Sequence, residues 1–180
     1  MDWHERYARF PRPFGEDPTP FLREVFERPA RFNLPTDPLR VLCPGDGYGR
    51  NGLWLARHGH SVVGLDLVPS AVSSALVVAG ESELDYVAIP ADISSSPFPI
   101  ARQTRFDAIV SAWMRLPDRT SRVDWNAECA RRLRQGGRIV FVGGSRVTDA
   151  ATEMGEWPSS VTWRDFSDED EVRLVGDKDR

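Results

Sequence analysis

The chain has 180 residues, of which 41% are hydrophobic and 28% are charged. This length predicts one domain with a sizeable hydrophobic core. The formal net charge of −4 argues against a dedicated nucleic-acid-binding protein, because such proteins usually carry a basic excess.

Cysteine content and hydropathy exclude further classes. Cys43 and Cys129 are too few and too far apart to suggest a disulfide framework or a metal cluster, so no metal is expected. No apolar run approaches the roughly 20 residues of a membrane span. The opening stretch MDWHERYARF lacks the apolar core of a signal peptide. We therefore expect a cytoplasmic protein without a membrane or nucleic-acid partner.

Residues 1–37 form an N-terminal arm that is rich in proline, arginine and phenylalanine. Short helices are predicted at Asp2–Phe10 and Pro20–Glu27, and Thr19 is a suitable N-cap for the second. The arm carries several aromatic side chains, and packing against the main core is the favoured interpretation. The alternative is a lid over a ligand, formed by Trp3, Arg6, Tyr7 and Phe14.

Residues 38–180 alternate between short apolar runs and amphipathic segments. Strands are predicted at Leu39–Cys43, Ser61–Leu65, Tyr86–Pro90, Phe106–Ser111 and Arg138–Gly143, and helices at Gly49–Arg57, Pro69–Ala79 and Asp124–Arg134. This alternation predicts an α/β fold with a Rossmann-like, doubly wound, mostly parallel sheet and helices on both faces. A short C-terminal β-hairpin is expected from Val161–Phe166 and Glu171–Val175, with a frayed end after it.

The stretch VLCPGDGYGRNGLWLA, Val41 to Ala56, predicts a strand, a glycine-rich turn and a helix. Gly45, Gly47 and Gly49 allow positive φ angles and leave room for a ligand against the backbone. The helix that follows favours a negative group at its N-terminus. The glycines fit either a G-x-G-x-G pattern or, with Gly52, the dinucleotide pattern G-x-G-x-x-G, and each pattern alone is weak evidence.

Further polar residues follow the predicted strands. Asp66 comes after the second strand, where a carboxylate can accept hydrogen bonds from ribose hydroxyls. Asp92 follows the third strand and can accept from an adenine amine, while the N–H of Ile93 can donate to a ring nitrogen. The first glycine register begins where the strand stops, and little chain remains for a nicotinamide half. These features favour an adenosyl ligand over a dinucleotide.

At this point a family resemblance becomes specific. The stretch VLCPGDGYGRNGLWLARHGHSVVGLDLVPSAV resembles the first half of the class I S-adenosylmethionine-dependent methyltransferases. W-x-E-R-Y at Trp3–Tyr7, G-R-N at Gly49–Asn51 and L-R-Q-G-G-R at Leu133–Arg138 are similar to motifs of the small tellurite-resistance and thiopurine methyltransferases. The resemblance covers roughly residues 1–144 and is weaker at the subfamily level.

The resemblance implies S-adenosylmethionine as cofactor, with S-adenosylhomocysteine as product. Asp66 would bind the ribose, Leu67 the adenine face, and Asp92 and Ile93 the adenine edge. Arg6 and Arg50 are candidates for the amino-acid carboxylate. The full implied cofactor set is Arg6, Gly45, Asp46, Gly47, Gly49, Arg50, Asn51, Asp66, Leu67, Ala91, Asp92, Ile93 and Ser111.

Two positions depart from the family pattern. Many class I enzymes carry an acid where this chain has Cys43, which we expect to be a small buried residue. The segment WMRLP places Arg115 where similar enzymes often have a histidine, and arginine cannot act as a base. No catalytic residue is predicted. Arg115 is a candidate for positioning the acceptor, and the predicted substrate-binding residues are Trp3, Tyr7, Phe14, Trp113 and Arg115.

These observations predict methyl transfer to a small-molecule acceptor that is anionic or a soft nucleophile, such as a thiol or a selenium or tellurium compound. A catalytically silent protein that binds the cofactor or its product is the first alternative. An NAD-binding oxidoreductase is a weaker alternative. Both a monomer and a homodimer are compatible with the sequence.

Overall fold

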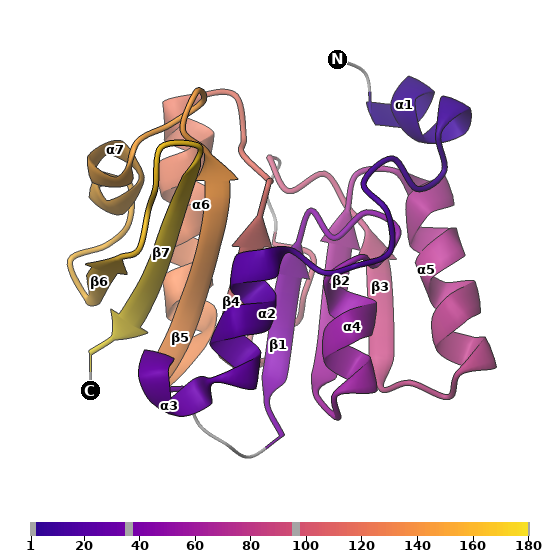
Figure 1. Cartoon of the computed structure of the whole chain (residues 1–180), viewed down its shortest axis with the longest axis horizontal. Helices are drawn as coiled ribbons and strands as arrows, with labels where there is room; N and C mark the ends of the chain where they lie inside the picture. Colours follow the sequence, from indigo (N-terminus) through magenta and orange to yellow (C-terminus); the bar gives the residue numbers. More distant parts are fainter. Residues whose placement is uncertain (1–2, 35–37, 95–97, 180) are drawn as a thin grey trace.

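The computed structural model describes residues 3–34, 38–94 and 98–179. These residues form a seven-stranded sheet in the order β3-β2-β1-β4-β5-β7-β6 (Figure 1). The strands are β1 Arg40–Pro44, β2 Ser61–Asp66, β3 Tyr86–Pro90, β4 Phe106–Ala112, β5 Leu133–Gly144, β6 Val161–Asp165 and β7 Glu171–Lys178. Strands β1 to β5 pair in parallel, whereas β7 pairs antiparallel with β5 and β6. The predicted mostly parallel sheet with a C-terminal hairpin is therefore confirmed.

Helices cover both faces of this sheet. They are α1 Trp3–Arg9, α2 Pro20–Glu27, α3 Pro29–Phe32, α4 Gly52–Arg57, α5 Pro69–Glu81, α6 Arg119–Arg132 and α7 Ala150–Gly155. In Figure 1, α2 and α4 lie in front of the sheet and α6 lies behind it. Residues of α2 to α5 share one hydrophobic cluster with the sheet, and residues of α6 pack in a second cluster on the other face.

The N-terminal arm divides into two parts with different environments. Phe21, Leu22 and Phe32 of α2 and α3 are buried in the front cluster, so the expectation of packing on the core is met there. Thr19 precedes α2 as predicted, but its hydroxyl does not cap the helix. Its backbone N–H donates to the side chain of Asn51 instead, which fastens the arm to the main domain.

Three predicted boundaries were wrong, each for a local reason. Helix α4 begins at Gly52 because Gly47 and Gly49 have positive φ angles that belong to a turn. Helix α6 begins at Arg119, where the Asp118 side chain accepts from the N–H of Ser121 and supplies an N-cap. Strand β5 begins at Leu133, where a helix was predicted to continue to Arg134, because Leu133 pairs with Phe106 at the start of β4.

The prediction for the C-terminal segment was also partly wrong. Strand β7 runs to Lys178, so residues 176–178 are paired and do not fray as predicted. Strand β7 lies between β5 and β6 and is hydrogen-bonded on both sides. Leu174 and Val175 are fully buried, one toward each face. This strand is therefore an integral part of the core.

A buried carboxylate holds the glycine loop between β1 and α4. Asp46 accepts hydrogen bonds from the Gly52 N–H at 3.0 Å and from the Tyr86 hydroxyl at 2.8 Å. Burial raises the pKa of Asp46 to about 6, and the hydrogen bond from Tyr86 opposes that rise. Gly64 of β2 lies directly under this pair, and a Cβ there would come within 2.6 Å of the Tyr86 hydroxyl.

The burial of β7 predicts the effect of a cavity-forming change. Replacing Leu174 with alanine should lower the free energy of unfolding by about 2–5 kcal/mol, because a fully buried leucine loses its packing. Urea denaturation of Leu174→Ala and of a control, Val77→Ala, measures this. Val77 is 59% exposed, and its change should stay within about 0.5 kcal/mol. Equal, small effects would show that the C-terminal strand is dispensable.

The environment of Asp46 predicts a pH-dependent stability. Its pKa is about 6 when folded, above the unfolded value, so the folded state binds more protons between the two values. The contribution of Asp46 to stability therefore falls as pH rises through that window. Asparagine does not titrate, so Asp46→Asn lacks this loss. The unfolding free energy of the variant minus that of the wild type should therefore rise by about 2 kcal/mol from pH 4.5 to pH 7.5. Urea denaturation at both pH values measures this, and a pH-independent difference would refute the raised pKa.

Candidate cofactor and acceptor site

The carboxyl ends of β1 and β2 are joined through the carboxylate of Asp66. One oxygen accepts from the Gly47 N–H at 2.8 Å, and the other accepts from the Val68 N–H at 2.9 Å. The Asp66 carbonyl accepts from the Ala91 N–H at 2.7 Å, which connects the end of β3 as well. Burial raises the pKa of Asp66, and these backbone N–H groups oppose the rise. The structure therefore brings the predicted glycine loop, ribose-binding acid and adenine segment together.

The glycine loop lies at the carboxyl end of β1 and has no side chains at three alternate positions. Gly45, Gly47 and Gly49 have φ angles of +66°, +57° and +82°. A Cβ on Gly45 would overlap the Met114 side chain, and one on Gly47 would overlap the hydroxyl of Tyr7. Only glycine permits both the conformation and such close contacts. This cradle, with the Asp66 carboxylate beneath it, fits a ligand that carries a ribose.

Helix α1 lies over the glycine loop through an aromatic cluster. Tyr7 packs edge-on against Tyr48 and stacks on Trp3, with ring centroids 6.0 and 5.9 Å apart. The Tyr48 hydroxyl donates to the Gly15 carbonyl and accepts from the Phe14 N–H. Burial raises the pKa of Tyr7, and the charge of Asp66 adds to the rise. Tyr7 therefore stays a neutral hydroxyl above the loop.

Several residues predicted for the cofactor lie between the arm and the loop. The Arg6 guanidinium lies over the rings of Trp3 and Phe14, 5.3 and 4.8 Å from their centroids. Arg50 donates from Nε to the Asp17 carbonyl at 2.6 Å. The Asn51 side chain accepts from Thr19 at 2.9 Å. In this conformation, Arg50 and Asn51 connect the arm to the main domain.

The predicted adenine side is formed by the ends of β2 and β3. Leu67 is 47% exposed at this edge. Asp92 accepts from both the N–H and the hydroxyl of Ser94, and these bonds lower the pKa of its carboxyl. Ile93 is half-buried against the rear hydrophobic cluster. Leu67 thus exposes an apolar side chain and Asp92 an ionised carboxylate at this edge of the sheet.

The end of β4 forms the opposite side of the loop. Ser111 is buried, and Trp113 is 49% exposed with its N–H bonded to the Val142 carbonyl. Trp113 has a φ of +60°, which is rare for a bulky residue and is enriched at functional sites. The next residue, Met114, turns back over Gly45. The Trp113 ring lies against Gly144 at the end of β5 and presents a large apolar surface there.

Arg115 points away from solvent, toward a helix that the sequence analysis did not predict. It donates to the Thr148 hydroxyl at 3.2 Å and lies 3.9 Å from Glu153 of α7 and 3.7 Å from Glu156, the C-cap of that helix. Arg122 binds both oxygens of Glu156, at 2.6 and 2.8 Å. The missed signal was Asp149, which caps α7 by accepting from the Thr152 N–H. Two carboxylates thus balance the charge of Arg115.

Cys43 is buried under the loop, as expected for a small core residue. Burial raises the pKa of its thiol well above the usual value, so it is neutral and no nucleophile. Among the described residues, no group of histidine, cysteine and carboxylate side chains is arranged to hold a metal ion. No helix in the described ranges is long and apolar enough to cross a membrane.

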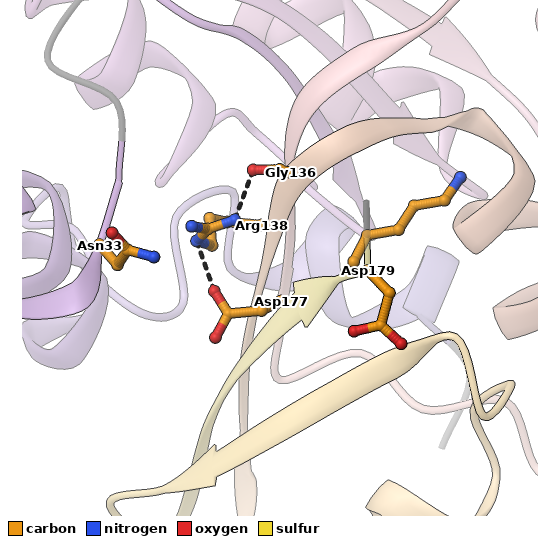
Figure 2. A pocket seen from close by; sticks show the side chains of 6 residues that line it. Asn33, Gly136, Arg138, Asp177 and Asp179 are labelled. Atoms are coloured by element: carbon orange, nitrogen blue, oxygen red, sulfur yellow. Dashed lines mark hydrogen bonds and ion pairs between the residues drawn. The ribbon is translucent and has the colours of Figure 1, made fainter.

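A cavity of about 330 Å³ lies at the far edge of the sheet, near the start of β5 and the end of β7. Its lining residues are Asn33, Gly136, Arg138, Asp177, Lys178 and Asp179. Figure 2 shows Arg138 between Asn33 and Asp177, with its guanidinium bonded to the Gly136 carbonyl and paired with Asp177 at 2.6 Å. This cavity is remote from the glycine loop, and its central arginine is already paired.

Comparison with known proteins identifies the family. Residues 41–137, more than half of the chain, match the family described as methyltransferase domain. No curated protein matches the sequence.

Three solved structures share the fold. PH0226 protein from Pyrococcus horikoshii OT3 has a TM-score of 0.75 at 14% identity, over 98% of this chain and 100% of that one. N-methyltransferase NodS from Bradyrhizobium japonicum WM9, in complex with S-adenosyl-L-homocysteine, has 0.71 at 20%, over 98% and 96%. A TehB-like SAM-dependent methyltransferase from Corynebacterium glutamicum ATCC 13032 has 0.68 at 21%, over 97% of each chain.

The family match supports a methyltransferase over the dinucleotide-binding oxidoreductase that the sequence offered as a weaker alternative. The solved structures add that the fold extends over nearly the whole chain. The chain belongs to the methyltransferase domain family and is a class I S-adenosylmethionine-dependent methyltransferase.

Proposed function

We propose that this protein transfers the methyl group of S-adenosylmethionine to a small-molecule acceptor at the edge between the glycine loop and β4. The observation that carries the proposal is the loop of Gly45, Gly47 and Gly49 joined to the buried Asp66 carboxylate, with Trp113 exposed at the end of β4. When bound, the cofactor supplies an electrophilic methyl group on its sulfonium.

The residues of the chain would bind and orient the reactants. Asp66 would accept from the ribose hydroxyls, Leu67 would contact the adenine face, and Asp92 would accept from its amine. The bare loop backbone would face the methionine part, together with Arg6. Because orientation alone can supply about 7–11 kcal/mol of the barrier, no further catalytic group is required for a reactive acceptor.

Residues 1–37 would act in part as a lid on the domain formed by residues 38–180. Tyr7 and Met114 both contact the glycine backbone in this structure. A cofactor on the loop would therefore displace these two side chains. Helix α1 is suited to such a movement, since none of its residues is buried. The cytoplasmic location and the choice between monomer and homodimer stay predictions.

The acceptor is proposed to be a small molecule with a soft or easily deprotonated nucleophile, such as a thiol. The exposed ring of Trp113, with Trp3, Tyr7 and Phe14 of the arm, offers apolar walls for it. The pairing of Arg115 with Glu153 and Glu156 favours a neutral, ionisable acceptor over a strongly anionic one. A similar structure is that of a 16S rRNA N2 G1207 methyltransferase, but the net charge of −4 disfavours a nucleic-acid acceptor here.

A second candidate function is a binding protein that holds the cofactor or its product without transfer. The neutral Cys43, at a position where many relatives have an acid, favours this candidate. Turnover distinguishes the two hypotheses, because both predict cofactor binding.

The test is formation of S-adenosylhomocysteine from S-adenosylmethionine with a panel of small thiols and phenols, followed by chromatography. We expect turnover with at least one thiol, and Trp113→Ala should reduce kcat/KM about tenfold by removing an aromatic wall. Val77→Ala, on the outer side of α5, serves as the control and should not change turnover. Cofactor binding without turnover of any acceptor would support the binding-protein hypothesis instead.

A further inference from the structure

Glu153 of α7 and Arg115 line a cavity of about 20 Å³ next to the end of β4. Ser111, Met114 and Phe141 contribute to the same lining. This volume admits a single group of the size of a water molecule or a hydroxyl. The cavity lies close to the glycine loop, because Met114 contacts both the cavity and Gly45.

Two polar atoms at this cavity are buried without a hydrogen-bond partner among the described residues. They are Nε of Arg115 and Oε2 of Glu153. The two atoms lie 3.9 Å apart, which is too long for a direct hydrogen bond. Glu153 is only 4% exposed, and its other oxygen accepts from the Trp157 indole at 3.4 Å. Buried polar atoms are rarely left unpaired, so this pair has the character of a binding site.

The neighbouring Glu156, at the C-cap of α7, shows what a purely structural carboxylate looks like. Arg122 bonds both of its oxygens, and the hydrogen bond from Arg122 lowers the pKa of Glu156. Glu153 lacks such a clamp, and burial raises the pKa of its carboxyl despite the nearby positive charges of Arg115 and Arg122. Glu153 is thus left available to accept a hydrogen bond.

The donor–acceptor pattern of the pair selects the chemistry of its ligand. The ligand atom must accept from the Arg115 N–H and donate to the Glu153 oxygen. A neutral hydroxyl can do both. An ammonium group only donates, and a carboxylate or phosphate only accepts and would be repelled by Glu153.

We propose that Arg115 and Glu153 form a notch that binds a hydroxyl group of the acceptor. This rests on the proposed function, since it assigns the acceptor to the side of the loop formed by β4. Both residues are positioning residues in this assignment. They orient the acceptor whether or not that hydroxyl is the atom that is methylated.

The test is an NMR titration in which small-molecule probes are added to ¹⁵N-labelled protein, with and without S-adenosylhomocysteine. The probes form two matched pairs, each with one hydroxyl compound and one hydrocarbon. Phenol is compared with toluene, and benzyl alcohol with ethylbenzene. The indole N–H signal of Trp157 reports on Glu153, and Trp157→Phe assigns it. We expect each hydroxyl probe to bind about tenfold more tightly than its hydrocarbon partner, as one or two hydrogen bonds predict.

Glu153→Gln keeps the side-chain shape but removes the charge. The preference for a hydroxyl probe over its hydrocarbon partner should therefore fall to about twofold or threefold. Arg115→Lys keeps a positive charge toward Glu156 but removes the Nε donor, and the same fall is expected. Glu81→Gln, at an exposed carboxylate at the end of α5, is the control, and it should leave the preference for hydroxyl probes unchanged.

Equal binding of hydroxyl and hydrocarbon probes by the wild type would overturn the notch. A preference that Glu153→Gln and Arg115→Lys both retain would also overturn it. Failure to bind S-adenosylhomocysteine, with the hydroxyl preference intact, would count against the proposed function alone.

Discussion

The hydrogen bond from the Gly47 N–H to the Asp66 carboxylate is the contact on which the rest of the site depends. It joins the loop after β1 to the end of β2, and the adjoining bond from Val68 fixes the carboxylate itself. Asp46 secures the other side of the loop through Gly52 and Tyr86. Two buried acids thus hold a backbone of positive φ angles in place, at the cost of charges that burial disfavours.

Much of this arrangement could be predicted from the sequence. The alternation of apolar runs from Leu39 onward indicated parallel strands, and parallel strands place their following residues at one edge. That rule predicts that Gly47, Asp66 and Ala91 lie close together, and the structure confirms it. The helix start at Gly49 was wrong because the pattern of apolar residues does not register a positive φ angle.

The acceptor side could not be predicted in the same way. The sequence indicated Arg115 as a group that positions the acceptor but did not identify its partners. Glu153 and Glu156 lie about forty residues later, in and just after a short helix with no strong periodicity. Only tertiary packing brings that helix against β5 and makes one glutamate structural and the other available. The difference between the two glutamates depends on which of them Arg122 binds, and no sequence pattern predicts that contact.

Calorimetric titration with S-adenosylhomocysteine tests the central claim most directly, with NADH as the control ligand. The account predicts that the wild type binds S-adenosylhomocysteine and not NADH, and that Asp66→Ala weakens this binding at least about tenfold while the protein stays folded. Asp124→Ala, an exposed acid on α6, should bind like the wild type. Wild-type affinity in Asp66→Ala, or no binding by folded wild-type protein, would contradict the assignment of the glycine loop as the cofactor site.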